Sequence, residues 1–92
     1  MVLYHATTAR KEKLYGHSGR IVAPVRGFDT VAGALAWACK VGRKVILKIE
    51  VDPSRVHKLP DHHNDFGTAF FSESDVTKWT GVFHGEKGIG AS

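Results

Sequence analysis

The sequence has little cysteine and no long apolar run, and each scarcity excludes a class of protein. Among its 92 residues there is one cysteine, Cys39, so an intramolecular disulfide and a cysteine-cluster metal site are excluded. No apolar run reaches the roughly 20 residues of a membrane-spanning helix, and the first residues lack the charged-then-apolar layout of a signal peptide. We therefore expect a soluble, cytoplasmic protein of a reducing compartment, without a membrane partner.

What remains is an ordinary globular composition with an uneven distribution of charge. Hydrophobic residues make up 42% and charged residues 24% of the chain, which fits one folded domain. We expect that domain over residues 1–84 and a flexible tail over residues 85–92. Residues 1–44 carry eight basic and two acidic side chains, whereas residues 45–92 carry five basic and seven acidic ones. The basic half suggests a phosphate-bearing ligand, and an uneven but inert surface is the alternative.

The order of the predicted elements favours a small α+β domain. Two helices are predicted, over residues 9–15 and 30–41, and the second begins at Asp29 or Thr30 and ends before Gly42. The many alanines of this second helix allow a close approach to a sheet. Branched or aromatic residues predict strands at 2–6, 20–23, 44–51, 55–59, 66–72 and 78–84. We expect a small mixed or antiparallel β-sheet with two helices.

A group of histidines and aspartates suggests a metal site, but its spacing argues against one. The group comprises His57, Asp61, His62, His63 and Asp65. His62 and His63 are adjacent, and adjacent side chains on an extended chain point to opposite sides. We therefore predict a solvated loop and no metal.

Other chemistry-bearing residues are expected to be structural. Cys39 lies in the alanine-rich helix, where a buried thiol is commoner than a reactive one. Most aromatic side chains of the C-terminal half are expected to lie in the core, namely Phe66, Phe70, Phe71, Trp79 and Phe83.

Four short motifs follow one another in an order that carries more information than any of them alone. The sequence Tyr-His-Ala-Thr at residues 4–7 closes the first predicted strand, and Gly-Phe-Asp-Thr at residues 27–30 leads into the alanine-rich helix with Trp37. A hydrophobic strand then ends in Ile-Glu-Val-Asp-Pro at residues 49–53, and Glu73 follows an aromatic strand. In this order the motifs resemble the ADP-ribosyltransferase-like superfamily, particularly small bacterial members similar to rifampin ADP-ribosyltransferase and the RNA 2′-phosphotransferases.

The resemblance covers residues 2–83 and implies a split β-sheet, NAD as cofactor and transfer of ADP-ribose to an acceptor that the sequence does not identify. It implies that His5 bonds a ribose hydroxyl, that Phe28 stacks on nicotinamide and that Glu73 is the catalytic carboxylate. Cleavage of the nicotinamide bond builds positive charge on the ribose, which a fixed carboxylate stabilises. The implied catalytic residues are His5 and Glu73, with Asp75 as a competitor for the acidic role. The implied cofactor-binding residues are His5, Thr7, Arg20, Arg26, Phe28 and Thr30.

Two other functions remain open at this point. One is a non-catalytic module that binds nucleotides or nucleic acid through a continuous basic face formed by Arg10, Lys11, Lys13, Arg20 and Arg26. The other is a protein-interaction module such as half of a homodimer, which would show a broad apolar patch. The transferase hypothesis instead requires His5, Phe28 and Glu73 to line one cleft. Each of the three also has a local explanation: a strand histidine with a backbone partner, a core phenylalanine, and the polar end of a strand.

Overall fold

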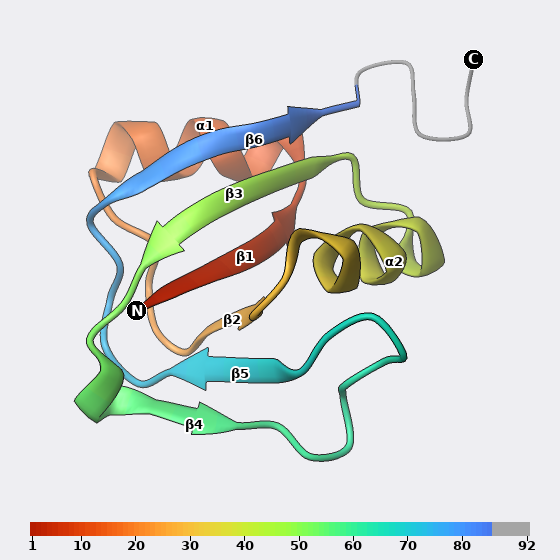
Figure 1. The fold of residues 1–92 in the computed structure, drawn as a ribbon. Coiled ribbons are helices and arrows are strands. Elements are labelled where there is room, and N and C mark those ends of the chain that lie inside the picture. Colours follow the sequence, from red (N-terminus) through yellow and green to blue (C-terminus); the bar gives the residue numbers. More distant parts are fainter. Residues whose placement is uncertain (86–92) are drawn as a thin grey trace.

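Six strands form one antiparallel sheet in the computed structural model, which describes residues 1–85 (Figure 1). The strands are β1 (Val2–Thr7), β2 (Val25–Phe28), β3 (Val45–Glu50), β4 (Val56–Lys58), β5 (Ala69–Ser72) and β6 (Trp79–His84). Their order across the sheet is β4-β5-β2-β1-β3-β6, and every pairing is antiparallel. With two helices, this arrangement confirms the predicted α+β class and selects the antiparallel form of the sheet.

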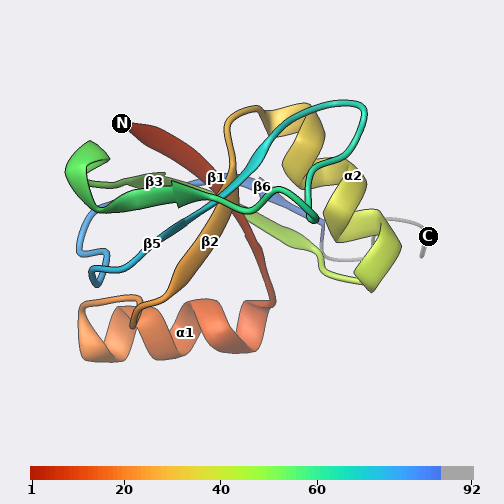
Figure 2. The same cartoon turned by 90° about the horizontal axis from the view of Figure 1, so that it is seen from below.

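The two helices lie on opposite faces of the sheet (Figure 2). Helix α1 spans Ala9–Ser18 and α2 spans Val31–Val41, and a short 3₁₀ helix, η1, spans Pro53–Arg55. Thr30 caps α2, because its side chain accepts a hydrogen bond from the Gly33 amide. Of the two predicted caps, Asp29 and Thr30, the structure therefore selects Thr30. Both helices therefore begin and end close to where capping residues predict, with one exception.

The exception is the end of α1, which was predicted at residue 15, just before Gly16, and this prediction is wrong. The helix continues to Ser18 and ends at Gly19, whose φ of 76° lies in the left-handed region. The Gly19 amide donates to the Tyr15 carbonyl, as a C-terminal cap does. Of two glycines three residues apart, the later one ends the helix because it adopts the left-handed conformation.

The strand predicted over residues 20–23 is also wrong. These residues form a connection, and within it Ile21 makes an isolated bridge to Val76. The strand lies after Pro24 instead, at Val25–Phe28, where β5 provides a pairing partner over the whole length. Both segments contain branched residues, so the choice between them is made by the partner strand rather than by local composition.

Strand β3 shows the alternation that its sequence predicts, and its two faces belong to two core clusters. Val45, Leu47 and Ile49 join the cluster that contains Leu3 and Val25. Ile46 joins the other cluster, which contains Phe28, Ala34, Ala38 and Ala69. The small residues of α2 thus pack directly on the sheet, as expected.

The expected burial of three side chains needs correction. Phe66 lies in a loop before β5, because β5 begins only at Ala69, and the Phe66 side chain is 61% exposed. Phe83 on β6 is also exposed, so these two aromatics are not part of the core. Cys39 is exposed as well, since α2 turns Gly33, Ala34 and Ala38 toward the sheet instead.

None of the helices within residues 1–85 has the length and apolar character needed to cross a membrane. The flexible tail was predicted over residues 85–92, and all of these except Gly85 lie outside the described residues. The Gly85 amide donates to the Lys44 carbonyl and so continues the pairing of β6 with β3.

Candidate functional site

The hydrogen-bonded ladder between β1 and β2 is unusually short. β1 pairs with β3 over all six residues, but with β2 only at Tyr4 and Phe28. Gly27 brings β2 close to β1 at this point, since an added Cβ would come within 2.9 Å of the Leu3 Cβ. Next to it the His5 imidazole takes the position of a backbone partner, with Nδ1 2.6 Å from the Arg26 carbonyl oxygen. A side chain therefore separates the two strands.

A cavity of about 850 Å³ lies beside this separation, and we call it the interstrand cavity. Its walls come from β1, α1, the α1–β2 connection and β2, with further side chains from α2 and the two loops that follow α2 and β4. The lining residues are His5, Ala6, Lys11, Leu14, Tyr15, His17, Ser18, Arg20, Ile21, Val22, Pro24, Val25, Arg26, Gly27, Phe28, Trp37, Arg43, Leu59, His62 and Ala69. A cavity of this size accommodates a ligand as large as a nucleotide.

The charge of this lining is of one sign. Four cationic side chains contribute to it, Lys11, Arg20, Arg26 and Arg43, and within residues 1–85 no aspartate or glutamate does. Arg20 is partly neutralised from outside, because its guanidinium lies 3.6 Å from Asp75. Such a wall attracts an anionic ligand, and arginine suits phosphate oxygens in particular.

His5 is held at both ring nitrogens. Nδ1 faces the Arg26 carbonyl, and Nε2 lies 3.1 Å from the Tyr15 hydroxyl. Burial is the main reason that the pKa of His5 is lowered from its ordinary value of 6.5. The hydrogen bond to Arg26 opposes this shift, and the charges of Arg43 and Lys11 add to it. A neutral imidazole therefore lines the cavity at neutral pH, with the local backbone partner that a structural strand histidine would have.

Apart from Tyr15 of α1, the large aromatic side chains of the lining come from β2 and α2. Phe28 and Trp37 lie with ring centroids 6.5 Å apart and ring planes tilted by 41°. Phe28 is also a member of a core cluster and only 5% exposed. It therefore combines the predicted position in the cavity wall with the packing role of a core residue.

The two predicted threonines lie outside the lining. Thr7 is fully buried, and its hydroxyl lies 3.2 Å from that of Tyr15. Thr30 accepts from the Gly33 amide and donates to the Phe66 carbonyl at 2.7 Å, so its hydroxyl joins α2 to the β4–β5 loop. The Thr7 hydroxyl thus contacts α1 through Tyr15, and the Thr30 hydroxyl contacts the β4–β5 loop through Phe66.

The predicted acidic residue Glu73 also lies outside the lining. It follows β5, with its carboxylate 2.9 Å from the His57 imidazole and 4.0 Å from Arg55, and its side chain is half exposed. Asp75, the competitor for the acidic role, accepts a hydrogen bond from the Ala23 amide. The structure thus brings His5 and Phe28 together with Arg20 and Arg26 in one cavity, but does not bring Glu73 into it.

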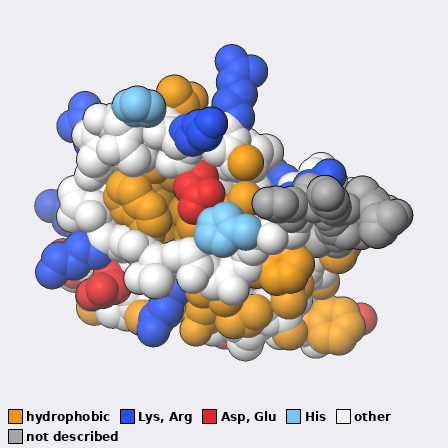
Figure 3. Space-filling view, turned by 90° about the horizontal axis from the view of Figure 1, so that it is seen from above, with side chains coloured by type: hydrophobic (Ala, Val, Ile, Leu, Met, Phe, Trp, Pro, Cys, Tyr) orange, Lys and Arg blue, Asp and Glu red, His pale blue; other side chains and the backbone are white. Residues whose placement is uncertain are grey.

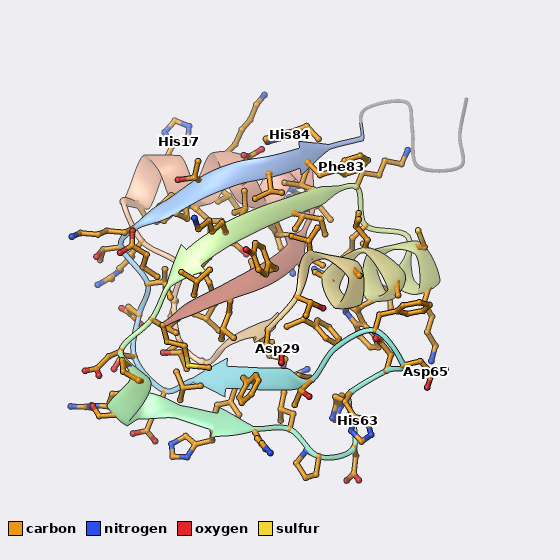
Figure 4. The ribbon with its side chains drawn as sticks, in the orientation of Figure 1. His17, Asp29, His63, Asp65, Phe83 and His84 are labelled. Carbon is orange, nitrogen blue, oxygen red and sulfur yellow. The ribbon has the colours of Figure 1, made fainter. Side chains whose placement is uncertain are left out.

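The histidine and aspartate group lies around the β4–β5 loop, and His63 and Asp65 occupy different parts of that loop (Figure 4). Within the part of the chain that the structure describes, no three histidine, cysteine, aspartate or glutamate side chains are placed to hold a metal ion. A smaller cavity of about 250 Å³ adjoins this loop and α2.

Tyr15, Trp37, Arg43 and His62 are lining residues that were not predicted to bind a ligand. Tyr15 was predicted only as part of a helix and Arg43 was only part of a charge count. Trp37 was part of the motif order without a role of its own, and His62 was considered only as a metal ligand and rejected. Lys11 was assigned to a possible nucleic-acid face rather than to a pocket. The preference of Arg for phosphate was the only available signal, and it applies to many surface arginines.

Comparison with protein-family models, with curated protein sequences and with solved structures finds no match for this chain.

Proposed function

We propose that the protein binds NAD, or a related nucleotide that carries ADP-ribose, in the interstrand cavity. The observation that carries this proposal is the composition of the cavity wall: four cationic side chains, no aspartate or glutamate within residues 1–85, and the aromatic rings of Tyr15, Phe28 and Trp37. Phosphates of the ligand would be held by Lys11, Arg20, Arg26 and Arg43. An aromatic ring of the ligand would pack against Phe28 and Trp37.

The second part of the proposal is an ADP-ribosyltransferase-like activity, which the order of the sequence motifs supports. In this activity Glu73 would stabilise positive charge that develops on the ribose. Because Glu73 pairs with His57 outside the cavity, it does not line one cleft with His5 and Phe28 as this activity requires. The role therefore needs the carboxylate to leave His57 and enter the cavity. Binding and transfer are therefore separate statements that need separate experiments.

The two tryptophans of the chain offer a direct test of binding. Trp37 lines the cavity, whereas Trp79 packs edge-on against Tyr15 at 6.2 Å and lies outside the lining. We expect NAD to change the intrinsic fluorescence in a saturable titration. Trp37→Phe should remove most of this change, and Trp79→Phe should retain it. A wild-type protein that shows neither a fluorescence change nor heat in calorimetry with NAD would refute the binding proposal.

Transfer is tested by release of nicotinamide from NAD, with water as the simplest acceptor. We expect the wild-type protein to release nicotinamide, and Glu73→Gln to bind NAD while losing turnover. The matched control is Glu50→Gln, which neutralises another exposed carboxylate, at the end of β3 and outside the cavity lining. Equal turnover in wild type and Glu73→Gln would show that Glu73 has no catalytic role.

A non-catalytic nucleotide-binding module is the second candidate, and the acid-free wall of the cavity favours it. Its signature would be NAD binding without nicotinamide release by the wild-type protein. Binding of nucleic acid to a continuous basic face is less favoured, because Lys11, Arg20 and Arg26, three of the five residues expected there, line the interstrand cavity. The one face seen in Figure 3 shows lysine and arginine side chains spread among hydrophobic and uncharged ones.

A further inference from the structure

Three side chains form a continuous hydrogen-bonded series in the wall of the interstrand cavity. It begins at the Arg26 carbonyl, passes through both nitrogens of His5 to the Tyr15 hydroxyl, and ends at the Thr7 hydroxyl. The successive distances are 2.6, 3.1 and 3.2 Å. His5 and Thr7 come from β1 and Tyr15 from α1, so the series joins the helix to the strand.

The direction of every hydrogen bond in this series follows from its first member. A carbonyl oxygen only accepts, so the 2.6 Å contact requires His5 Nδ1 to carry the proton and donate to Arg26. In a neutral imidazole Nε2 is then an acceptor, and the lowered pKa of His5 agrees with the neutral form. The Tyr15 hydroxyl must therefore donate its only proton to Nε2.

The same reasoning gives the direction of the hydrogen bond between Thr7 and Tyr15, and shows which acceptor position remains free. Because the Tyr15 proton points to His5, Thr7 must donate to the Tyr15 oxygen. His5 then has no free nitrogen, and Thr7 is fully buried with its proton used. A phenolic oxygen has two lone pairs, and Thr7 occupies only one of them. The remaining acceptor position in the series is on Tyr15, whose side chain lines the cavity.

We propose that the Tyr15 hydroxyl oxygen accepts a hydrogen bond from a ribose hydroxyl of the bound nucleotide, and so makes Tyr15 a specificity-determining residue of this site. This inference rests on the proposed nucleotide binding and names the sugar chemistry that the site selects. His5 acts in it as a positioning residue, because it receives the tyrosine proton and thereby turns the free lone pair of Tyr15 toward a donor. The series selects a hydroxyl-bearing sugar over an analogue without that hydroxyl.

Removal of the Tyr15 hydroxyl is the first test, because Tyr15→Phe keeps the ring that packs against the core and Trp79. We expect the Kd for NAD, measured by calorimetry, to rise about tenfold, as for the loss of one neutral hydrogen bond. The matched control is Tyr4→Phe, which removes the hydroxyl of the other tyrosine in the chain, outside the cavity lining. Tyr4→Phe should bind NAD as the wild type does.

A set of NAD analogues gives a readout that a merely structural role of Tyr15 would not change. Four analogues, each lacking one 2′- or 3′-hydroxyl of the nicotinamide ribose or of the adenosine ribose, are titrated into wild type and Tyr15→Phe. We expect the wild type to bind one analogue about tenfold more weakly than NAD, and Tyr15→Phe to bind that analogue and NAD equally. If Tyr15→Phe does not fold, the wild-type preference among these ligands is still measurable, and equal affinities for all of them would overturn the inference.

The outcomes separate this inference from the function on which it rests. Absence of NAD binding by the wild-type protein would refute the proposed function. Tight NAD binding that is equal in wild type and Tyr15→Phe would refute the role of Tyr15 and leave nucleotide binding intact.

Discussion

The two helices meet the sheet in opposite ways. Helix α2 buries Gly33, Ala34 and Ala38 against it, whereas α1 has no buried residue and contacts the core through the partly buried Tyr15. Small side chains bring a helix down onto a sheet, and long or polar ones hold it away. The space that α1 leaves is part of the interstrand cavity, to which α1 contributes Lys11, Leu14, Tyr15, His17 and Ser18. Helix α1 thus contributes mainly to the cavity wall, whereas α2 contributes mainly to the core and adds Trp37 to that wall.

The largest effect is expected from one substitution made in both helices. Ala34→Leu places a large side chain at a position with 0% exposure on α2, and overpacking should lower the free energy of unfolding by about 1–3 kcal/mol. Ala9→Leu adds the same atoms to an exposed position of α1 and should change it by less than about 0.5 kcal/mol. Urea unfolding followed by circular dichroism measures both. Equal effects would mean that α1 packs as closely as α2.

A second comparison concerns charge inside and outside the cavity, at two neighbouring residues. Arg43 lines the cavity, and Lys44 is exposed and does not. Arg43→Glu should raise the Kd for NAD about tenfold or more, since a charged hydrogen bond is lost. Lys44→Glu makes the same change in net charge, and at physiological salt we expect a change within about twofold. Similar effects of the two variants in calorimetric titrations would indicate a diffuse electrostatic attraction rather than contact.

Much of the fold is predictable because its signals are local. The alternation in β3 and the N-terminal cap of α2 depend on residues within a few positions of each other, and both are confirmed. The end of α1 and the position of β2 depend on which of two similar segments finds a partner. Val25–Phe28 becomes a strand because β5 pairs with it, and β5 lies more than forty residues away. No local pattern contains that information.

Two sources of information pointed to residues of the cavity. The motif resemblance implied His5 and Phe28, the affinity of arginine for phosphate supported Arg20 and Arg26, and all four line the cavity. Tyr15 was not predicted, because nothing in a tyrosine near a helix end indicates that its hydroxyl meets a histidine ten residues earlier. Its importance arises from the packing of α1 on β1, which is a tertiary feature. The functional roles of all these residues stay predictions.

The buried His5 and the exposed His63 should also differ in how they affect stability at acid pH. The pKa of His5 is lowered by burial, so below pH 6.5 the unfolded chain binds a proton at this residue more readily than the folded protein. The contribution of His5 to stability is therefore fully present above its unfolded pKa, and is lost as the pH falls from 6.5 through the lowered folded value. Urea unfolding at a series of pH values should show a shallower loss for His5→Gln than for wild type. His63→Gln, on an exposed loop, is the matched control, and a profile of His5→Gln identical to wild type would contradict the assignment.

The smallest effect is expected where α1 contacts the far edge of the sheet. Glu12 of α1 lies 2.8 Å from His84 of β6, in an exposed contact between residues 72 positions apart. Exposed ion pairs contribute about 0–1 kcal/mol, because solvent screens them and two side chains must be ordered. A double-mutant cycle with Glu12→Gln and His84→Asn at pH 6 should therefore give a coupling energy below about 1 kcal/mol. A larger coupling would mean that α1 is held by its polar contacts, and that Tyr15 is not its main attachment to the sheet.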